Sequence, residues 1–391
     1  MKKYLFEINA ERVLLFALIY YGLSIYFDVL FYDVTSIPIF LIANDKYFPS
    51  SIYFYSWIVP IFSCIIYLIL SKFKSKNSNN VNNHIQNNDR LNIILLFGYF
   101  LYFFILLIIM PNADNRAFVF LEINENYSLV SWLLPITIWC SCFSILFAKN
   151  KFEIFISFFL VIIFSLTLVD RSYLLMGVLA LLFRLKKLNF FLLAFLAILG
   201  FFVVTFWKVV LFWLVFNIDI YASLENVQPG LARFEAITSQ SIFINCIEFN
   251  QCSQIDLSLF FESTFGRIMP SLIYQSEVDT TQVRYIDQFF PEIAERGGGL
   301  GYSLMAEFSL TMGKITGPWF LTIYIIFLLS ILRFTKSPIV HFIFAVYFLR
   351  FLRVDFATGI KGIFVFGFVS LVIYNALSII TNLRKIKINA T

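Results

Sequence analysis

The arginine residues of this chain are the side chains best suited to chemistry, and their distribution is uneven. Arginine presents paired N–H donors in a planar, permanently charged fork, so it holds phosphate in a bidentate manner better than lysine does. The segments expected on the outer side of a membrane contain more arginine than lysine. Their arginines are Arg116, Arg171, Arg233, Arg267, Arg284, Arg296, Arg350 and Arg353, and their lysines are Lys46, Lys208, Lys314 and Lys361. Two explanations are open for these arginines: they bind a phosphorylated ligand, or they pair with neighbouring Asp and Glu residues.

The segment 297–320, GGGLGYSLMAEFSLTMGKITGPWF, contains a second set of groups suited to chemistry. Glu307 follows a small residue near the expected start of a helix. Its carboxylate can accept a proton from a hydroxyl, or it can interact with the positive end of the helix dipole. The glycines at 297–299 favour a flexible, non-helical backbone beside Arg296. That backbone either lets main-chain amides approach an anion or acts as a hinge.

Two cysteines, Cys246 and Cys252, lie in a polar segment with five residues between them. In an oxidising compartment this spacing favours a local disulfide, and the alternative is a pair of free thiols. The other cysteines, Cys64, Cys140 and Cys142, lie in apolar segments.

Motifs for cofactors and metals are absent from the sequence. There is no Walker motif, no G-x-S-x-G, no H-E-x-x-H and no C-x-x-C pair. The chain has 2 histidines, His84 and His341, so a histidine-ligated metal centre is not expected. We therefore expect no metal, no cofactor and no nucleic-acid partner.

The composition indicates whether this protein is soluble in water or embedded in a membrane. Hydrophobic residues make up 60% of the chain and charged residues 14%, whereas about a quarter of the residues of a soluble protein are charged. A helix needs about 20 apolar residues to cross a bilayer. The sequence therefore predicts an all-α, polytopic membrane protein with about ten spans, at 13–32, 51–70, 91–110, 127–148, 154–169, 172–183, 188–216, 315–332, 338–354 and 361–380.

Lysine and arginine counts in the short loops predict the orientation, because cytoplasmic loops carry an excess of both. With the N-terminus inside, the inner loops and ends hold Lys2, Lys3, Arg12, Lys72, Lys74, Lys76, Arg90, Lys149, Lys151, Arg184, Lys186, Lys187, Arg333, Lys336, Arg384, Lys385 and Lys387. The C-terminus is then also inside. No removable signal peptide is expected after the first span.

This topology divides the chain into 1–216 with seven spans, 217–314 as a large outer loop, and 315–391 with three spans and an inner C-terminus. Within the loop, 257–274 and 283–293 carry Phe, Leu and Ile at mixed helical spacing. That pattern predicts amphipathic helices on the membrane surface or over a cavity.

Two charged turns are expected below the outer surface of the membrane. Arg184 marks the inner end of the span that begins near Arg171, and the helix between these two residues would be only about 20 Å long. Asp170 comes directly before Arg171. Arg350 and Arg353 lie about 18 and 22 Å beyond Pro338 along the ninth span, and Asp355 follows them. Ionisable groups at such depth face a protein interior or a wet cavity. Either the arginines line an outward-opening cavity, or the aspartates merely neutralise them.

These residues together carry a family resemblance. The segment 297–320, with its glycines, Tyr302, Ala306-Glu307, Gly313 and Gly317, resembles the junction of outer loop and membrane in the Wzy-type O-antigen and oligosaccharide repeat-unit polymerases. The turns 170–172 and 353–356 resemble other basic positions of that family. The number of spans, the inner termini and the large outer loop match as well.

The resemblance implies a metal-independent membrane glycosyltransferase of the Gram-negative inner membrane, with its site facing the periplasm. It would transfer a growing glycan from undecaprenyl pyrophosphate to the non-reducing end of a new lipid-linked repeat unit. Membrane lipid and a chain-length regulator protein are the other partners implied. The resemblance implies catalytic roles for Glu307, Arg171 and Arg353, and substrate contacts for Arg267, Arg284, Arg296, Arg350, Asp170, Asp355 and Tyr302.

Alternatives remain open at this point. An O-antigen ligase would use the same donor, but a histidine in the outer loop would favour it and this loop has none. A lipid-linked oligosaccharide flippase usually has more spans in two similar halves and no large periplasmic loop. An acyltransferase would call for a catalytic histidine, and a channel for a symmetric repeat.

Overall fold

Helices account for nearly all of the residues that the structure describes. The computed structural model describes residues 5–7, 9–31, 51–74, 89–112, 119–148, 150–168, 171–185, 187–189, 240–248, 250–253, 255–268, 281–289, 291, 302–335, 337–350 and 354–376. The described residues also include two short antiparallel β-strands: β1 (Leu5–Glu7) pairs with β2 (Lys187–Asn189), with Phe6 opposite Leu188. The predicted all-α class is therefore confirmed for the described residues apart from this pair.

The described elements fall into two units. The first unit contains the β pair and, at its centre, the helix α5 (Ser128–Phe147). Around α5 lie the helices α3 (Asp89–Phe104), α4 (Val119–Asn126), α6 (Lys151–Thr167) and α7 (Arg171–Leu185), and α3 continues into η1 (Ile105–Ile109) and η2 (Met110–Asn112). The helices α6 and α7 contact each other, and α7 begins at Arg171. The depth of this charged end below the membrane surface stays a prediction.

Small polar side chains explain why α5 can be surrounded by other helices. The hydroxyls of Ser141 and Ser144 donate to carbonyl oxygens one turn earlier, at 2.8 and 2.9 Å, so their burial leaves no unpaired hydroxyl. Small residues of this kind allow close packing of helices in membrane proteins.

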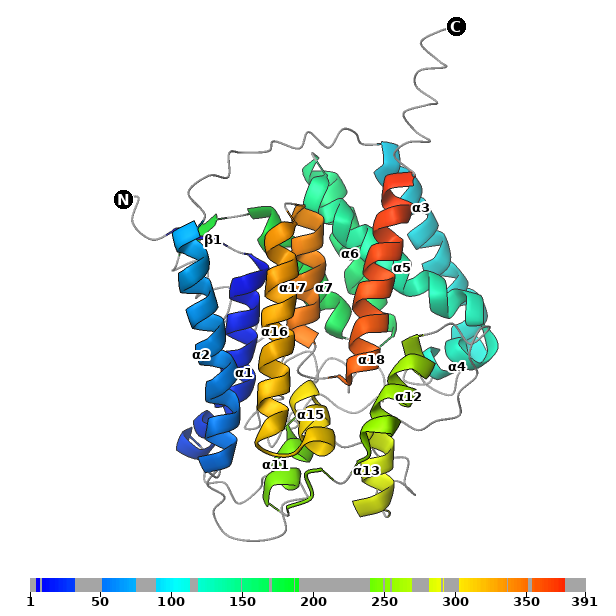
Figure 1. Cartoon of the computed structure of the whole chain (residues 1–391). Helices are drawn as coiled ribbons and strands as arrows, with labels where there is room; N and C mark the ends of the chain where they lie inside the picture. The colour runs from blue at the N-terminus through cyan, green and yellow to red at the C-terminus, as the bar shows by residue number, and fades with distance from the viewer. Residues whose placement is uncertain are drawn as a thin grey trace, which may run out of the picture. The chain divides into compact units, whose positions relative to one another are not determined.

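The second unit holds the longest helices of the described chain together with the short helices of the polar segment. Its elements are α1 (Ala10–Phe31), α2 (Ser51–Lys74), α11 (Ser241–Glu248), α12 (Leu257–Ile268), α13 (Thr281–Phe289), α15 (Leu304–Met312), α16 (Thr316–Phe334), α17 (Pro338–Arg350), α18 (Phe356–Gly359) and η4 (Ile360–Val365). The helix α1 contacts α2 and α17, and α2 contacts α16 (Figure 1). The short helix α15 packs against α16 and α11, and α12 packs against α18 and α15.

Among the described residues, 5 helices are long and apolar enough to cross a membrane: Ser51–Leu70, Ile94–Asn112, Ser128–Phe147, Thr316–Phe334 and Phe356–Ala376. All five coincide with predicted spans. Their exposed side chains include Phe62, Ile66, Phe100, Ile323 and Phe327, which suit contact with lipid rather than water. These features support the prediction of a membrane protein.

The other predicted spans differ from the structure in several ways. The predicted spans 13–32, 154–169 and 172–183 correspond to α1, α6 and α7, and the last of these is a shorter apolar helix. The described part of the ninth helix spans Pro338–Arg350, and its predicted end at 354 was wrong, because Val354 is not helical and Asp355 is the N-cap of α18. The helix predicted over 188–216 was wrong at residues 188 and 189, whose backbone pairs with β1. Its remainder lies outside the described residues.

The helices predicted in the polar segment are present as α12 and α13 within the described parts of 257–274 and 283–293, and α13 begins earlier than expected, at Thr281. The Asp256 side chain caps α12 by accepting a hydrogen bond from the Ser258 N–H at 3.1 Å, and this bond holds the pKa of Asp256 below its ordinary value. The division into 1–216, 217–314 and 315–391 concerns topology in a membrane, and it stays a prediction.

Candidate functional site

The carboxylate of Glu307 lies at the centre of the candidate site. The helix α15 begins after Ser303, whose hydroxyl accepts a hydrogen bond from the Ala306 N–H at 3.2 Å and so acts as the N-cap. This cap places Glu307 in the first turn, and the side chain is only 2% exposed. A buried carboxylate is costly unless its oxygens are paired, so the partners of Glu307 define the site.

Two other elements supply partners to this carboxylate. The Thr281 hydroxyl, at the start of α13, donates to Oε1 of Glu307 at 3.0 Å. The backbone N–H of Phe356, the first residue of α18, donates to Oε2 at 2.6 Å. Glu307 therefore connects α15 to the starts of α13 and α18.

Tyr302 extends this network by one hydroxyl. Its Oη lies 2.6 Å from Thr281 Oγ1. A threonine hydroxyl has a single hydrogen, which here points to Glu307, so the bond between the two hydroxyls is donated by Tyr302. Tyr302 and Thr281 are 3% and 0% exposed. Tyr302 thus donates a hydrogen bond to Thr281, and Thr281 donates one to Glu307. All three side chains are buried.

A second carboxylate lies at the same helix start. Asp355 is buried and is the N-cap of α18, accepting from the Thr358 N–H at 2.6 Å and from the Thr358 hydroxyl at 2.8 Å. The amides of a helix N-terminus need acceptors, and Asp355 and Glu307 both provide them here. Arg353 precedes Asp355 by two residues in the sequence.

Aromatic side chains surround this pair of carboxylates. Phe356 contacts Phe260, Phe308 and Tyr324, with ring centroids 5.8, 6.4 and 5.3 Å apart. The hydroxyls of Tyr324 and Tyr347 are 2.7 Å apart. Such a lining keeps the local dielectric low, which strengthens the hydrogen bonds to Glu307.

The glycines that follow α15 allow the chain to turn directly into α16. Gly313 has φ +97°, a backbone conformation that non-glycine residues rarely adopt. Gly317 packs so closely that a Cβ there would lie 2.8 Å from the Cα of Ser309. Together they bring α15 against α16.

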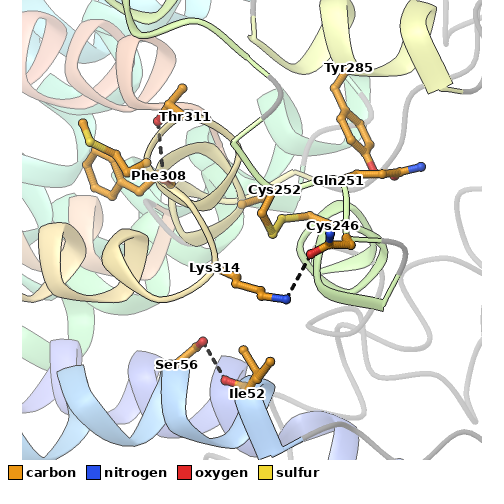
Figure 2. The surroundings of a disulfide bond; sticks show 12 residues. Ile52, Ser56, Cys246, Gln251, Cys252, Tyr285, Phe308, Thr311 and Lys314 are labelled. Atoms are coloured by element: carbon orange, nitrogen blue, oxygen red, sulfur yellow. Dashed lines mark hydrogen bonds between the residues drawn. A yellow bond between two sulfur atoms is a disulfide. The ribbon is translucent and has the colours of Figure 1, made fainter.

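A disulfide-closed loop packs on the other end of α15. Cys246 and Cys252 form the disulfide expected from the sequence, with their Cα atoms 4.9 Å apart (Figure 2). Just beyond it, the N–H groups of Ser253 and Ile255 donate to the carbonyl oxygens of Ser309 and Leu310 at 3.2 and 3.3 Å. The loop thereby provides donors to carbonyls in the last turn of α15.

Side chains add to this attachment. Lys314 donates to the Asn250 side chain at 3.0 Å. The Tyr285 hydroxyl of α13 donates to the Gln251 side chain at 2.5 Å. Figure 2 shows these two side chains beside the disulfide. Burial raises the pKa of Tyr285, so this phenol stays protonated and remains a donor. The loop therefore contacts both α13 and the turn after α15.

The structure brings some predicted site residues together and separates others. Glu307, Tyr302 and Asp355 lie in one region of the second unit. Arg350 is the last residue of α17, and Arg284 lies on the exposed face of α13. Arg171 begins α7 in the first unit, and Arg267 lies near the end of α12. Asp170, Arg296 and Arg353 lie outside the described residues.

Thr281 is the site residue that sequence reasoning missed. It follows Thr280 in a polar stretch, and no local pattern marks one threonine as the partner of a carboxylate far along the chain. Among the described residues, His, Cys, Asp and Glu side chains form no group of three that could hold a metal ion.

The arrangement offers a buried carboxylate that accepts hydrogen bonds from two helix starts, with aromatic rings packed around Phe356 beside it. Chemically, it can accept a proton or orient a hydroxyl. No protein-family model, no curated protein and no solved structure matches this chain.

Proposed function

We propose that the chain is a polymerase of lipid-linked repeat units, of the O-antigen type, in the inner membrane of a Gram-negative bacterium. It transfers the growing glycan from undecaprenyl pyrophosphate to the non-reducing end of a new repeat unit carried on the same lipid. The proposal takes its substrates from the sequence resemblance. The helices long and apolar enough to cross a membrane support the setting.

One observation carries this proposal: the hydrogen bond of 2.6 Å from the Phe356 N–H to Glu307. Glu307 belongs to the sequence segment 297–320, and Phe356 is the last residue of the sequence segment 353–356. These are two of the segments on which the resemblance rests, and they are far apart in the chain. Their direct contact supports the idea that both belong to one site.

The chemistry requires a base and a group that neutralises the leaving phosphate. The hydroxyl oxygen of the acceptor sugar attacks the anomeric carbon of the donor glycan. The bond from that carbon to the pyrophosphate oxygen breaks, and undecaprenyl pyrophosphate leaves with the electron pair. The hydroxyl proton passes to the carboxylate of Glu307. Because pyrophosphate is already an activated leaving group, no nucleotide takes part.

Arginines complete this scheme. Arg171 and Arg353 neutralise the charge that develops on the departing pyrophosphate. Arg267, Arg284, Arg296 and Arg350 attract and hold the anionic lipid head groups and the glycan. Asp355, which caps α18, and Tyr302 complete the substrate contacts that the resemblance implies.

The topology follows the charge distribution, with both termini in the cytoplasm and the segment 217–314 in the periplasm. The disulfide in this segment supports an oxidising compartment. A chain-length regulator of the inner membrane is the protein partner that fits such an enzyme.

Deletion of the gene tests the proposal, because the candidate functions leave different products. Without a polymerase, single repeats are still flipped and ligated. We therefore expect a lipopolysaccharide gel with core plus one repeat and no ladder, restored to a ladder by the intact gene. A bare core with long lipid-linked chains would point to a ligase instead. Repeats retained on the cytoplasmic side would point to a flippase.

A further inference from the structure

We propose that Thr281 is a positioning residue for Glu307, and that Tyr302 acts through Thr281. This inference rests on the proposed function, in which Glu307 receives the proton of the acceptor hydroxyl. It assigns a role to a residue in the polar segment that no sequence motif marks.

Hydrogen bonds to both carboxylate oxygens set the geometry around Glu307. The Phe356 N–H holds one oxygen at 2.6 Å, and the Thr281 hydroxyl holds the other at 3.0 Å. Donors on two different elements therefore restrict rotation of the carboxylate. A base that is fixed in one orientation meets the reacting hydroxyl in the productive geometry more often.

The hydrogen bonds of Thr281 have a defined direction. Thr281 can donate its one hydrogen either to Glu307 or elsewhere. The Tyr302 hydroxyl at 2.6 Å occupies a lone pair of Thr281 Oγ1 and so favours donation toward Glu307. Tyr302 therefore acts on the orientation of the carboxylate through Thr281.

The three side chains of this network are buried. Thr281, Tyr302 and Glu307 are at most 3% exposed, so water does not readily replace a lost hydroxyl in this network. A hydrogen bond to a charged group in such surroundings is stronger than one between neutral groups. Its loss is therefore expected to lower turnover measurably.

The chain offers a closely matched control. The hydroxyl of Thr311, on the same helix as Glu307, donates to the backbone carbonyl of Glu307 at 2.9 Å. Thr311→Val removes a threonine hydroxyl bonded to the same residue but leaves the carboxylate and its partners in place. Any effect of Thr281→Val beyond that of Thr311→Val belongs to the carboxylate.

The experiment measures turnover and donor KM for the purified full-length protein. The substrate is the undecaprenyl-pyrophosphate-linked repeat unit extracted from cells that lack this gene. We expect Thr281→Val to lower kcat by about tenfold to a hundredfold with little change in donor KM. We expect Thr281→Ser to retain most activity and Thr311→Val to stay near wild type.

A double-mutant cycle tests the order of the network, and its single variant Tyr302→Phe remains informative if Thr281→Val folds poorly. Tyr302→Phe removes one oxygen atom and should lower kcat several-fold on its own. In the Thr281→Val background it should have no further effect, because the residue through which it acts is gone.

Several results would overturn the inference. These are wild-type kcat in Thr281→Val, equal losses in Thr281→Val and Thr311→Val, a change confined to donor KM, or wild-type kcat in Tyr302→Phe. The fate of the proposed function is read separately from the wild-type protein: if that protein forms no polymer from the extracted repeat units, the proposed function fails first.

Discussion

Glu307 and Phe356, which are 49 residues apart in the chain, are joined by a hydrogen bond of 2.6 Å from the Phe356 N–H to Oε2 of Glu307. The sequence left two roles open for Glu307: it accepts a proton, or it interacts with the N-terminus of its own helix. The structure directs its side chain to the N-terminus of a different helix, α18. The carboxylate therefore has a structural task in addition to the proposed catalytic one, and the two can be separated by mutation.

The first prediction separates these tasks. Glu307→Gln keeps a carbonyl oxygen for the Phe356 N–H but removes the charge, so turnover should fall strongly while the protein folds and binds donor. Glu307→Ala also leaves the Phe356 N–H unpaired, which costs about 1–3 kcal/mol, so this variant should unfold at lower temperature. Turnover assays and thermal unfolding in detergent measure both. Full turnover in Glu307→Gln would exclude Glu307 as the base.

The second prediction concerns Arg171 and Arg353. If they neutralise the leaving pyrophosphate, Arg→Ala at either position should abolish chain growth while the protein stays in the membrane. Arg→Lys should restore little activity, because lysine lacks the bidentate fork. The measurement is the polymer ladder on a gel, with an immunoblot of the membrane fraction as control. Normal ladders from both alanine variants would contradict the clamp.

The third prediction concerns the disulfide between Cys246 and Cys252. A bond that closes so short a loop should contribute about 2 kcal/mol to stability. The double variant Cys246→Ser, Cys252→Ser should therefore unfold at lower temperature but keep activity well below its midpoint. In native, unreduced protein neither thiol should react with an alkylating reagent. Complete inactivity of the double variant at every temperature would show that the loop does more than support α15.

The fourth prediction concerns the glycines after α15. Gly317→Ala would place a Cβ 2.8 Å from the backbone of Ser309, and such overpacking costs about 1–3 kcal/mol. Gly313→Ala would force an alanine into φ +97°, at a similar cost of about 1–3 kcal/mol. Gly362→Ala is the matched control, because a Cβ there meets nothing within 4 Å. Thermal unfolding should rank the control nearest to wild type, and equal stability of all three variants would refute the packing argument.

The sequence by itself determined the class of this protein and the approximate position of many helices. Apolar runs of about 20 residues predict spans because a bilayer demands that length and leaves no other partner for the backbone. The spans beginning near 51, 127 and 315 therefore coincide with helices of the structure. The pairing of Cys246 with Cys252 was also predictable, since so short a separation brings the two residues together locally.

Only the tertiary structure decided how the polar groups meet. The contacts of Glu307 with Thr281 and with the Phe356 N–H join segments that are 26 and 49 residues away in the chain. Such bonds depend on how α13, α15 and α18 pack, and neither periodicity nor composition records the direction of a single hydroxyl or amide. The segment 187–189 shows the same limit, because its backbone pairs with Leu5–Glu7 and the apolar pattern after it gave no sign of a strand. Local sequence fixes which segments enter an apolar layer, whereas the partners of a buried carboxylate are chosen by the packing of the whole unit.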